Sequence, residues 1–156
     1  MIAVKNKIFT EIEINASTEQ VWSVLTDWNK LKEWSSSFVG ISTDNLAKGM
    51  HSISYYINPI TGKIMNVEHE IVDYEEGSKF GWSGKIIGKV KDHHIFSLEK
   101  TNRGTTIFKQ EDGFHSKNSL STIMNFLMRN FMTSSYNKFN KELKERVEFL
   151  YSKKSI

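Results

Sequence analysis

The sequence contains no cysteine, a single proline and nine glycines in 156 residues. The absence of cysteine excludes disulfide bonds, thiolate metal ligands and cysteine nucleophiles. No apolar run approaches the roughly 20 residues that a membrane-spanning helix needs. The first fifteen residues mix Lys and Glu with apolar side chains, unlike a signal peptide. We therefore expect a protein without a transmembrane segment, located in the cytoplasm.

Charge is present in both signs, with 21 basic and 18 acidic residues and a net charge of +3. The densest basic stretch, from Lys138 to Lys154, alternates Lys and Arg with Glu at i,i+4 spacing, which is typical of a solvated helix face. A basic stripe interleaved with aromatic residues is missing, so a nucleic-acid partner is not expected. Aromatic residues make up 12% of the chain and indicate a sizeable core. We expect one domain spanning residues 1–156.

The hydrophobic pattern predicts a strand, two short helices and then a series of strands. Apolar and polar residues alternate over Ile8–Ile14, as in a half-buried strand. Ser17 and Gln20 have the spacing of a capping box and predict the start of a helix. A second short helix is expected over Asn29–Trp34. Between Phe38 and Phe114 the period is mostly two and is broken at turn-like clusters, which indicates an antiparallel meander.

The last segment changes to helical spacing. Apolar residues recur every three or four positions from Leu120 to Leu150, and no Pro or Gly follows Gly113, so one long helix is predicted. A helix of that length must lay its apolar face on the sheet. The expected fold class is α+β: a curved antiparallel sheet of about seven strands wrapped around a long C-terminal helix, with two short helices after the first strand.

Three segments carry a resemblance to a known family. They are Ile14–Asp27 with Trp34 seven residues on, Phe80–Gly84 followed by His94–Glu99, and Gly104–Phe114. Together they resemble the SRPBCC or START-like helix-grip superfamily, and most closely its bacterial polyketide cyclase/dehydrase-like branch. The resemblance covers nearly the whole chain and implies a cavity between sheet and helix. It differs at Asp112, where the branch usually has Glu.

A helix-grip fold implies that the cavity lining follows strand parity and the inner face of the helix. Met side chains on that helix adapt to varied apolar partners, so a hydrophobic or aromatic small molecule, such as a lipid, is the expected partner. The same residues could instead be close-packed core. Trp34 and Phe38 are expected at the mouth. The other candidate binding residues are Tyr55, Ile57, Trp82, His94, Phe96, Phe108, Gln110, Phe114, Met124, Met128 and Phe131.

Turn geometry predicts a polar pair at the cavity wall. A three-residue hairpin loop, Asn102–Gly104, ends on a glycine that can adopt the left-handed conformation, and this register places His94 opposite Asp112. A two-residue loop would instead bring Lys109 and Glu111 onto the apolar face, which is costly without partners. We expect His94 and Asp112 to form a hydrogen-bonded pair that favours the imidazolium. The two residues are the candidate catalytic groups, although a polar pair that only satisfies itself is the alternative.

The five histidines do not form a metal-binding motif. His93 and His94 are adjacent in a predicted strand and must point to opposite faces, and neither HExxH nor HxH occurs. Nucleotide-binding and nucleophile-elbow motifs are also missing from the sequence. Neither a metal nor a cofactor is therefore expected.

Three functions remain open at the level of sequence. The first is binding of a hydrophobic or aromatic molecule in the cavity. The second is a polyketide cyclase or dehydratase-like enzyme that uses the His94/Asp112 pair. The third is a protein-interaction or regulatory module whose groove receives an apolar segment of a partner. A homodimer is compatible with the sequence, which identifies neither the ligand nor the reaction.

Overall fold

The structure is a computed structural model that describes residues 7–87, 90–115 and 119–152, apart from the side chains at positions 86, 87, 120, 121, 124 and 125. Two short helices follow the first strand, and a long helix ends the described chain. The elements are β1 (Ile8–Ile14), α1 (Thr18–Leu25), the 3-10 helix η1 (Trp28–Lys30), α2 (Leu31–Trp34), β2 (Phe38–Ile41), β3 (His51–Ile57), β4 (Ile64–Glu75), β5 (Lys79–Ser83), β6 (Lys85–Ile87), β7 (Val90–Asp92), β8 (His94–Lys100), β9 (Thr106–Asp112), β10 (Phe114–His115) and α3 (Leu120–Ser152).

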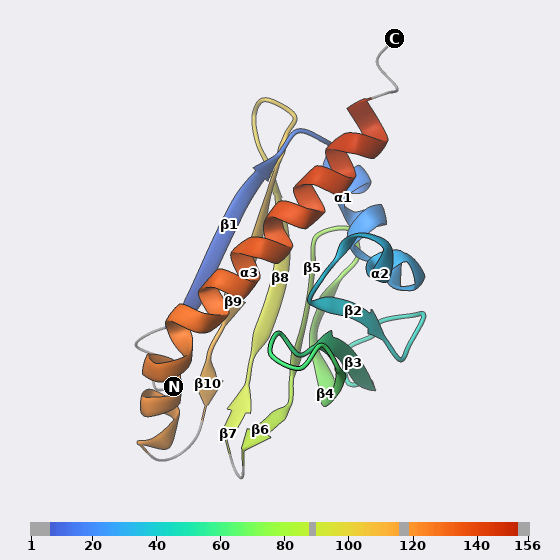
Figure 1. Cartoon of the computed structure of the whole chain (residues 1–156). Helices are drawn as coiled ribbons and strands as arrows, with labels where there is room; N and C mark the ends of the chain where they lie inside the picture. The colour runs from blue at the N-terminus through green and yellow to red at the C-terminus, as the bar shows by residue number, and fades with distance from the viewer. Residues whose placement is uncertain (1–6, 88–89, 116–118, 153–156) are drawn as a thin grey trace.

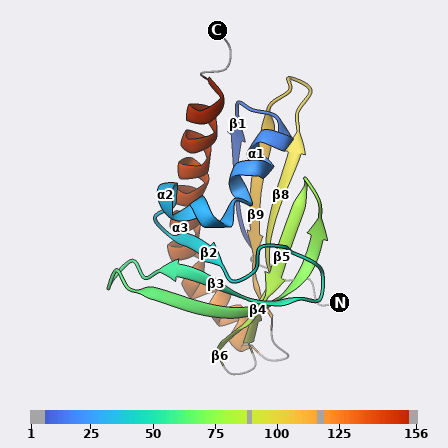
Figure 2. The ribbon, with the colours of Figure 1, turned by 90° about the vertical axis from the view of Figure 1, so that its right-hand side faces the viewer.

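Seven strands form one antiparallel sheet in the order β1-β9-β8-β5-β4-β3-β2. The sheet curls strongly, so that in Figure 2 β3 and β4 run across the direction of β1 and β9. The helix α3 lies along the concave side, in front of β1, β9 and β8 in Figure 1. A smaller sheet, β10-β7-β6, extends the lower end. The predicted helix-grip fold is confirmed.

The second half of α3 anchors the helix to the sheet. Phe139, Leu143 and Val147 are buried there, spaced at i,i+4 along one face. They join the main apolar cluster, which also contains Phe80, Trp82, Phe96 and Phe108 from the strands. The sequence placed both the helix and its buried face correctly for this half, because the sheet lies beneath it.

The capping box predicted at Ser17 is present. The Ser17 Oγ accepts a hydrogen bond from the Gln20 backbone N–H at 3.2 Å, and the Gln20 side chain accepts one from the Ser17 N–H at 3.0 Å. Ser17→Ala is expected to lower the free energy of unfolding by about 1 kcal/mol, because one backbone donor loses its partner. Chemical denaturation measures the change. Ser17→Asp should retain most of the stability, and an equal loss in both variants would contradict a capping role.

The β8–β9 hairpin has the predicted register. Gly104 has a φ of +80°, and Phe96 pairs with Gln110 and Leu98 with Phe108. The Thr101 N–H donates to the Thr105 carbonyl at 2.9 Å and closes the three-residue loop. This register aligns His94 and Asp112 on the concave face, at the cavity end of the two strands.

The chain after Lys79 does not continue as one uninterrupted strand. It separates into β5 and β6 at Gly84, whose N–H donates to the Asp92 carboxylate at 2.7 Å. A Cβ at this position would lie 2.4 Å from the Glu68 carbonyl oxygen, so only glycine fits. The break turns the chain into the smaller sheet and carries Asp92 into the cavity wall.

Candidate binding cavity

A cavity of about 220 Å³ lies between the concave face of the sheet and α3. Its wall is largely apolar and aromatic, with a small group of polar side chains on one side. Because a cavity of about 150 Å³ admits benzene, this volume suits a ligand of about one or two rings. The lining residues are Ser37, Phe38, Tyr56, Ile57, Pro59, Met65, Val67, Trp82, Asp92, His94, Phe96, Gln110, Asp112, Met128, Phe131, Met132, Ser135, Tyr136 and Phe139.

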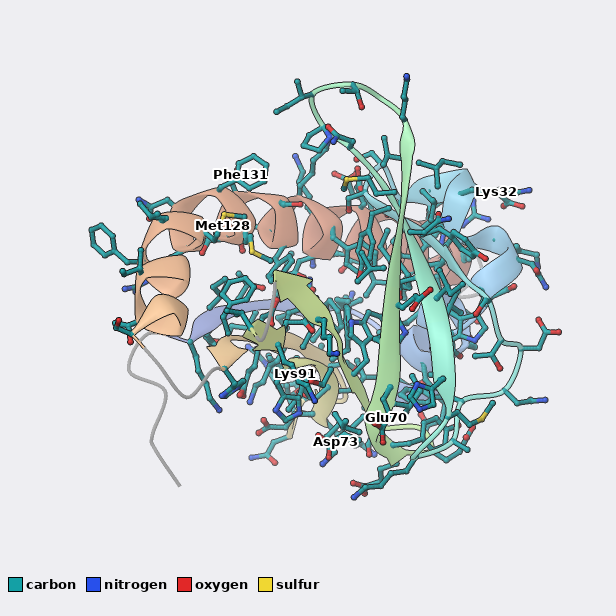
Figure 3. All side chains as sticks on the ribbon, turned by 90° about the horizontal axis from the view of Figure 1, so that it is seen from below. Lys32, Glu70, Asp73, Lys91, Met128 and Phe131 are labelled. Atoms are coloured by element: carbon teal, nitrogen blue, oxygen red, sulfur yellow. The ribbon has the colours of Figure 1, made fainter. Side chains whose placement is uncertain are left out.

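The more exposed lining residues come from the β3–β4 hairpin and the first half of α3. Pro59 and Met65 belong to the hairpin, and Met65 is 40% exposed. Phe131 on α3 is 55% exposed. Figure 3 shows Phe131 on the side toward which the hairpin extends, opposite Glu70 and Lys91. The mouth of the cavity therefore lies between these two elements.

A chain of buried amides fixes the polar side of the cavity. The Gln110 Nε2 donates to Asn140 Oδ1 at 2.6 Å and to the Tyr136 carbonyl at 3.3 Å. The Asn140 Nδ2 donates in turn to Thr10 Oγ1 at 3.0 Å. All three side chains are buried, and they link β9, α3 and β1. We call Gln110, Asn140 and Thr10 the amide relay.

The amide relay determines the tautomer of His94. Because Gln110 donates through its nitrogen, its Oε1 is left to accept from His94 Nε2, at 2.9 Å. Burial lowers the pKa of His94 to about 4, so the ring is neutral at pH 7. Its Nδ1 then carries a lone pair and can only accept a hydrogen bond. The ring is held in place by stacking on Phe96 and Tyr136.

Two carboxylates lie on the same side of the cavity as His94. Burial raises the pKa of Asp112 to about 6, although its oxygens accept hydrogen bonds from the Tyr136 hydroxyl and from the Gly113 N–H at 2.7 Å. Burial and repulsion from Asp112 raise the pKa of Asp92 to about 6. The Asp112 Oδ2 is 3.9 Å from His94 Nδ1. We call His94, Asp92 and Asp112 the acceptor corner.

Comparison with known proteins identifies the family. A family model described as polyketide cyclase/dehydrase and lipid transport matches residues 5–148. The chain belongs to this family. The resemblance inferred from the sequence is thus confirmed. No curated protein matches the sequence significantly.

Solved structures with the same fold share little sequence with the chain. A START superfamily protein from Mycobacterium smegmatis has a TM-score of 0.68 at 17% identity, with 92% of this chain and 98% of that chain covered. A protein from Chromobacterium violaceum has a TM-score of 0.67 at 14% identity, covering 92% and 98%. The di-domain ARO/CYC StfQ from the steffimycin biosynthetic pathway has a TM-score of 0.68 at 9% identity, covering 94% and 52%. At these identities the likeness extends to the fold.

Among the residues predicted to bind a ligand in this polyketide cyclase/dehydrase family protein, eight line the cavity. These are Phe38, Ile57, Trp82, His94, Phe96, Gln110, Met128 and Phe131. The side chain of Met124 lies outside the described part of the chain. The four remaining residues, Trp34, Tyr55, Phe108 and Phe114, lie elsewhere in the fold.

Tyr55 was assigned to the wrong face of its strand. Its apolar neighbours Ile53 and Ile57 suggested an inward row, but the buried residues of β3 are Ser52 and Ser54. The half-buried Tyr56, on the same face as these serines, lines the cavity, and so does Ile57 at the end of the strand. The inward face of β3 is polar because Ser54 contacts the buried ring of His69 on β4, at 3.3 Å from Nδ1. Hydrophobicity alone therefore gave the wrong parity.

Trp34, Phe108 and Phe114 pack elsewhere for distinct reasons. Trp34 lies against Phe139, with ring centroids 5.2 Å apart, on the α2 side of α3 and away from the cavity mouth. Phe108 is fully buried beneath Phe139 and belongs to the core. Phe114 lies beyond β9, in a separate cluster with Ile8 and Val90.

The expected hydrogen bond between His94 and Asp112 is absent, since 3.9 Å exceeds hydrogen-bond length. His94 bonds to Gln110 instead, and Asp112 to Tyr136. The expectation that the carboxylate favours the imidazolium is also wrong. Burial dominates and lowers the pKa of His94. The predicted register was correct, but α3 supplies partners that strand pairing cannot reveal.

The first half of α3 turns a row of apolar residues away from the cavity. Ile123 and Leu127 are 52% and 65% exposed, although the apolar residues of this helix were expected to face the sheet. Met128, Met132 and Tyr136 lie inward, packed against the cluster that contains Ile8 and Val90.

Sequence reasoning missed Asp92, Tyr56 and Tyr136 as cavity residues. The position of Asp92 depends on the break at Gly84, that of Tyr56 on the parity of β3, and that of Tyr136 on the rotation of α3.

Within the described ranges, no group of three or more His, Asp or Glu side chains is arranged to hold a metal ion. His93 points away from His94 and contacts Asp73 at 3.2 Å on the outer face, as the strand parity requires.

None of the described helices is long and apolar enough to cross a membrane. What the cavity offers chemically is a largely apolar space with hydrogen-bond acceptors at the acceptor corner.

Proposed function

We propose that this family member binds a small hydrophobic or aromatic molecule in the cavity beneath α3. The observation that carries the proposal is a largely apolar cavity of about 220 Å³ with a small group of polar side chains in its wall. The aromatic side chains Phe38, Trp82 and Phe96 provide flat apolar surfaces for a ring. The family description, which includes lipid transport, supports the proposal.

Filling the cavity tests the proposal. Met128→Trp should reduce the affinity for the neutral two-ring dye 6-propionyl-2-(dimethylamino)naphthalene by about tenfold or more, equivalent to about 1.4 kcal/mol, because the indole occupies the ligand space. Dye fluorescence measures the affinity. Asn130→Trp, on the exposed face of the same helix, is the control and should bind the dye like the native protein. If the residues were close-packed core, Met128→Trp would destabilise by about 1–3 kcal/mol without affecting the dye.

A cyclase or dehydratase-like activity is the second candidate, and the acceptor corner favours it. A neutral imidazole beside a carboxyl group with a pKa of about 6 can exchange protons with a bound substrate near pH 7. Native mass spectrometry of the purified protein detects a co-purified small molecule. Incubating that molecule with the protein and measuring its mass again distinguishes binding from catalysis. A ligand recovered unchanged after incubation supports binding, whereas conversion to a product lighter by one water supports the enzyme.

A further inference from the structure

The polar groups of the acceptor corner are arranged to receive a hydrogen-bond donor, and this feature limits the chemistry of the ligand proposed above. His94 Nδ1 carries a lone pair, because the amide relay holds the proton on Nε2. The nearest Asp112 oxygen is a carboxylate oxygen, and Tyr136 already donates its hydroxyl proton to it. Neither group therefore has a proton to offer a ligand when Asp112 is ionised.

The separation of these two acceptors suits one shared donor. His94 Nδ1 and Asp112 Oδ2 are 3.9 Å apart, too far to bond to each other. A donor atom at about 2.8–2.9 Å from each, an ordinary hydrogen-bond length, can contact both. Asp92 lines the same cavity, and its charge acts on both His94 and Asp112. The acceptor corner thus provides three acceptors, and a protonated primary amine has three donors.

The charges of the cavity wall also favour a ligand with a cationic hydrogen-bond donor. Among the described residues that line the cavity, two are carboxylates and none is Lys or Arg. The carboxylates repel each other, and Asp92 is destabilised in its charged form by Asp112. A cation between them would relieve this repulsion, whereas an anion would add to it. Aromatic side chains, including Trp82 and Tyr56, surround the remaining space and can contact a cation through their faces.

We propose that the cavity selects a small aryl-alkyl amine, with the protonated amino group in the acceptor corner and the ring among the aromatic side chains, and that it rejects the corresponding carboxylate. The inference rests on the proposed binding function and adds the class of head group. A free fatty acid is then a poor ligand, since its carboxylate would face Asp92 and Asp112 with no basic partner on the described wall.

Three probes with the same carbon skeleton test the head group. They are 3-phenylpropylamine, 3-phenylpropan-1-ol and 3-phenylpropionate, whose binding is measured by calorimetry at pH 7.5. We expect the amine to bind about tenfold or more tightly than the carboxylate, with the alcohol between them, as a charge-assisted hydrogen bond is stronger than a neutral one. An equal or tighter carboxylate would overturn the inference while leaving the binding function intact. Failure of all three probes to bind would overturn both.

Variants of the corner separate specific contacts from net charge. Asp112→Asn should weaken the amine about tenfold and leave the alcohol within about twofold. Glu111→Gln removes the same charge from the opposite face of β9, where Glu111 is partly exposed, and should leave both affinities unchanged. Equal losses of amine binding in the two variants would overturn the assignment of the amino group to the corner. Asp92→Asn removes the other carboxylate of the acceptor corner and should also weaken binding of the amine.

Discussion

Replacing Phe139 with alanine is expected to lower the free energy of unfolding by about 3–5 kcal/mol, the usual cost of truncating a buried phenylalanine. Phe139 is 3% exposed and is the point at which α3 meets the aromatic core. Its ring lies between about 5 and 6.5 Å from four others, those of Trp34, Phe38, Phe96 and Phe108. No neighbouring side chain on a rigid sheet can fill the space that alanine leaves, so most of the cost is retained.

Phe126→Ala is the matched control, because it removes the same side chain from the same helix at a position that is 74% exposed. It should change stability by less than about 0.5 kcal/mol. Urea denaturation of both variants measures the difference. Similar small changes in the two variants would mean that α3 is not anchored at Phe139. Since Phe139 also lines the cavity, Phe139→Ala should admit larger ligands at temperatures where it remains folded.

Asp112→Asn is expected to increase the free energy of unfolding, relative to the native protein, more at neutral pH than at acid pH. Burial raises the pKa of Asp112 from 3.8 to about 6, so the native state disfavours the carboxylate. Ionisation of Asp112 therefore lowers the free energy of unfolding of the native protein. The loss is close to zero below pH 3.8, grows as the pH rises toward 6 and stays constant above pH 6. Asparagine cannot ionise. The stability difference between variant and native protein should shift in favour of the variant by about 2–3 kcal/mol between pH 4 and pH 7.5.

Other groups titrate near Asp112, so the comparison must be made at each pH. Asp92 has a raised pKa of the same origin, and His94 has a pKa lowered to about 4. His93 and Tyr136 also act on Asp112. All of these groups remain in the variant, but Asp92 is no longer repelled by a charged Asp112, so its own ionisation costs less there and adds to the expected shift in the same direction. Glu111→Gln is the control, and it should show less than about 0.5 kcal/mol of change. A variant that gains nothing between the two pH values would show that Asp112 ionises without penalty.

The sequence predicted the fold well because each element is locally consistent. The capping box at Ser17, the alternation over Ile8–Ile14 and the helical spacing after Leu120 each specify one structure. The β8–β9 register was also predictable, since the loop ending on Gly104 and the outward placement of Lys109 agree. Local signals and burial point to the same answer at these positions.

The site was less predictable, because its geometry depends on how α3 is rotated and where it sits on the sheet. Opposed residues on β8 and β9 were identified, but the actual partners of His94 and Asp112 are Gln110 and Tyr136. Strand pairing places Cβ atoms and leaves side-chain rotamers to the surroundings. On β3 the rule that apolar residues face inward failed, because the inner face of Ser52, Ser54 and Tyr56 is a polar part of the interior.

The amide relay also restricts how the helix can slide or turn. Asn140 reaches Gln110 on β9 and Thr10 on β1 at the same time. A shift of α3 by one residue would bring Phe139 or Lys141 to that place and leave the Gln110 donor that now bonds to Asn140 unpaired, at a cost of about 1–3 kcal/mol. Neighbouring leucines, valines and phenylalanines would tolerate such a shift far better, because apolar contacts are not directional. Asn140 therefore fixes the register of α3 on the sheet: it selects one alignment of helix and sheet among several that the apolar face alone would accept.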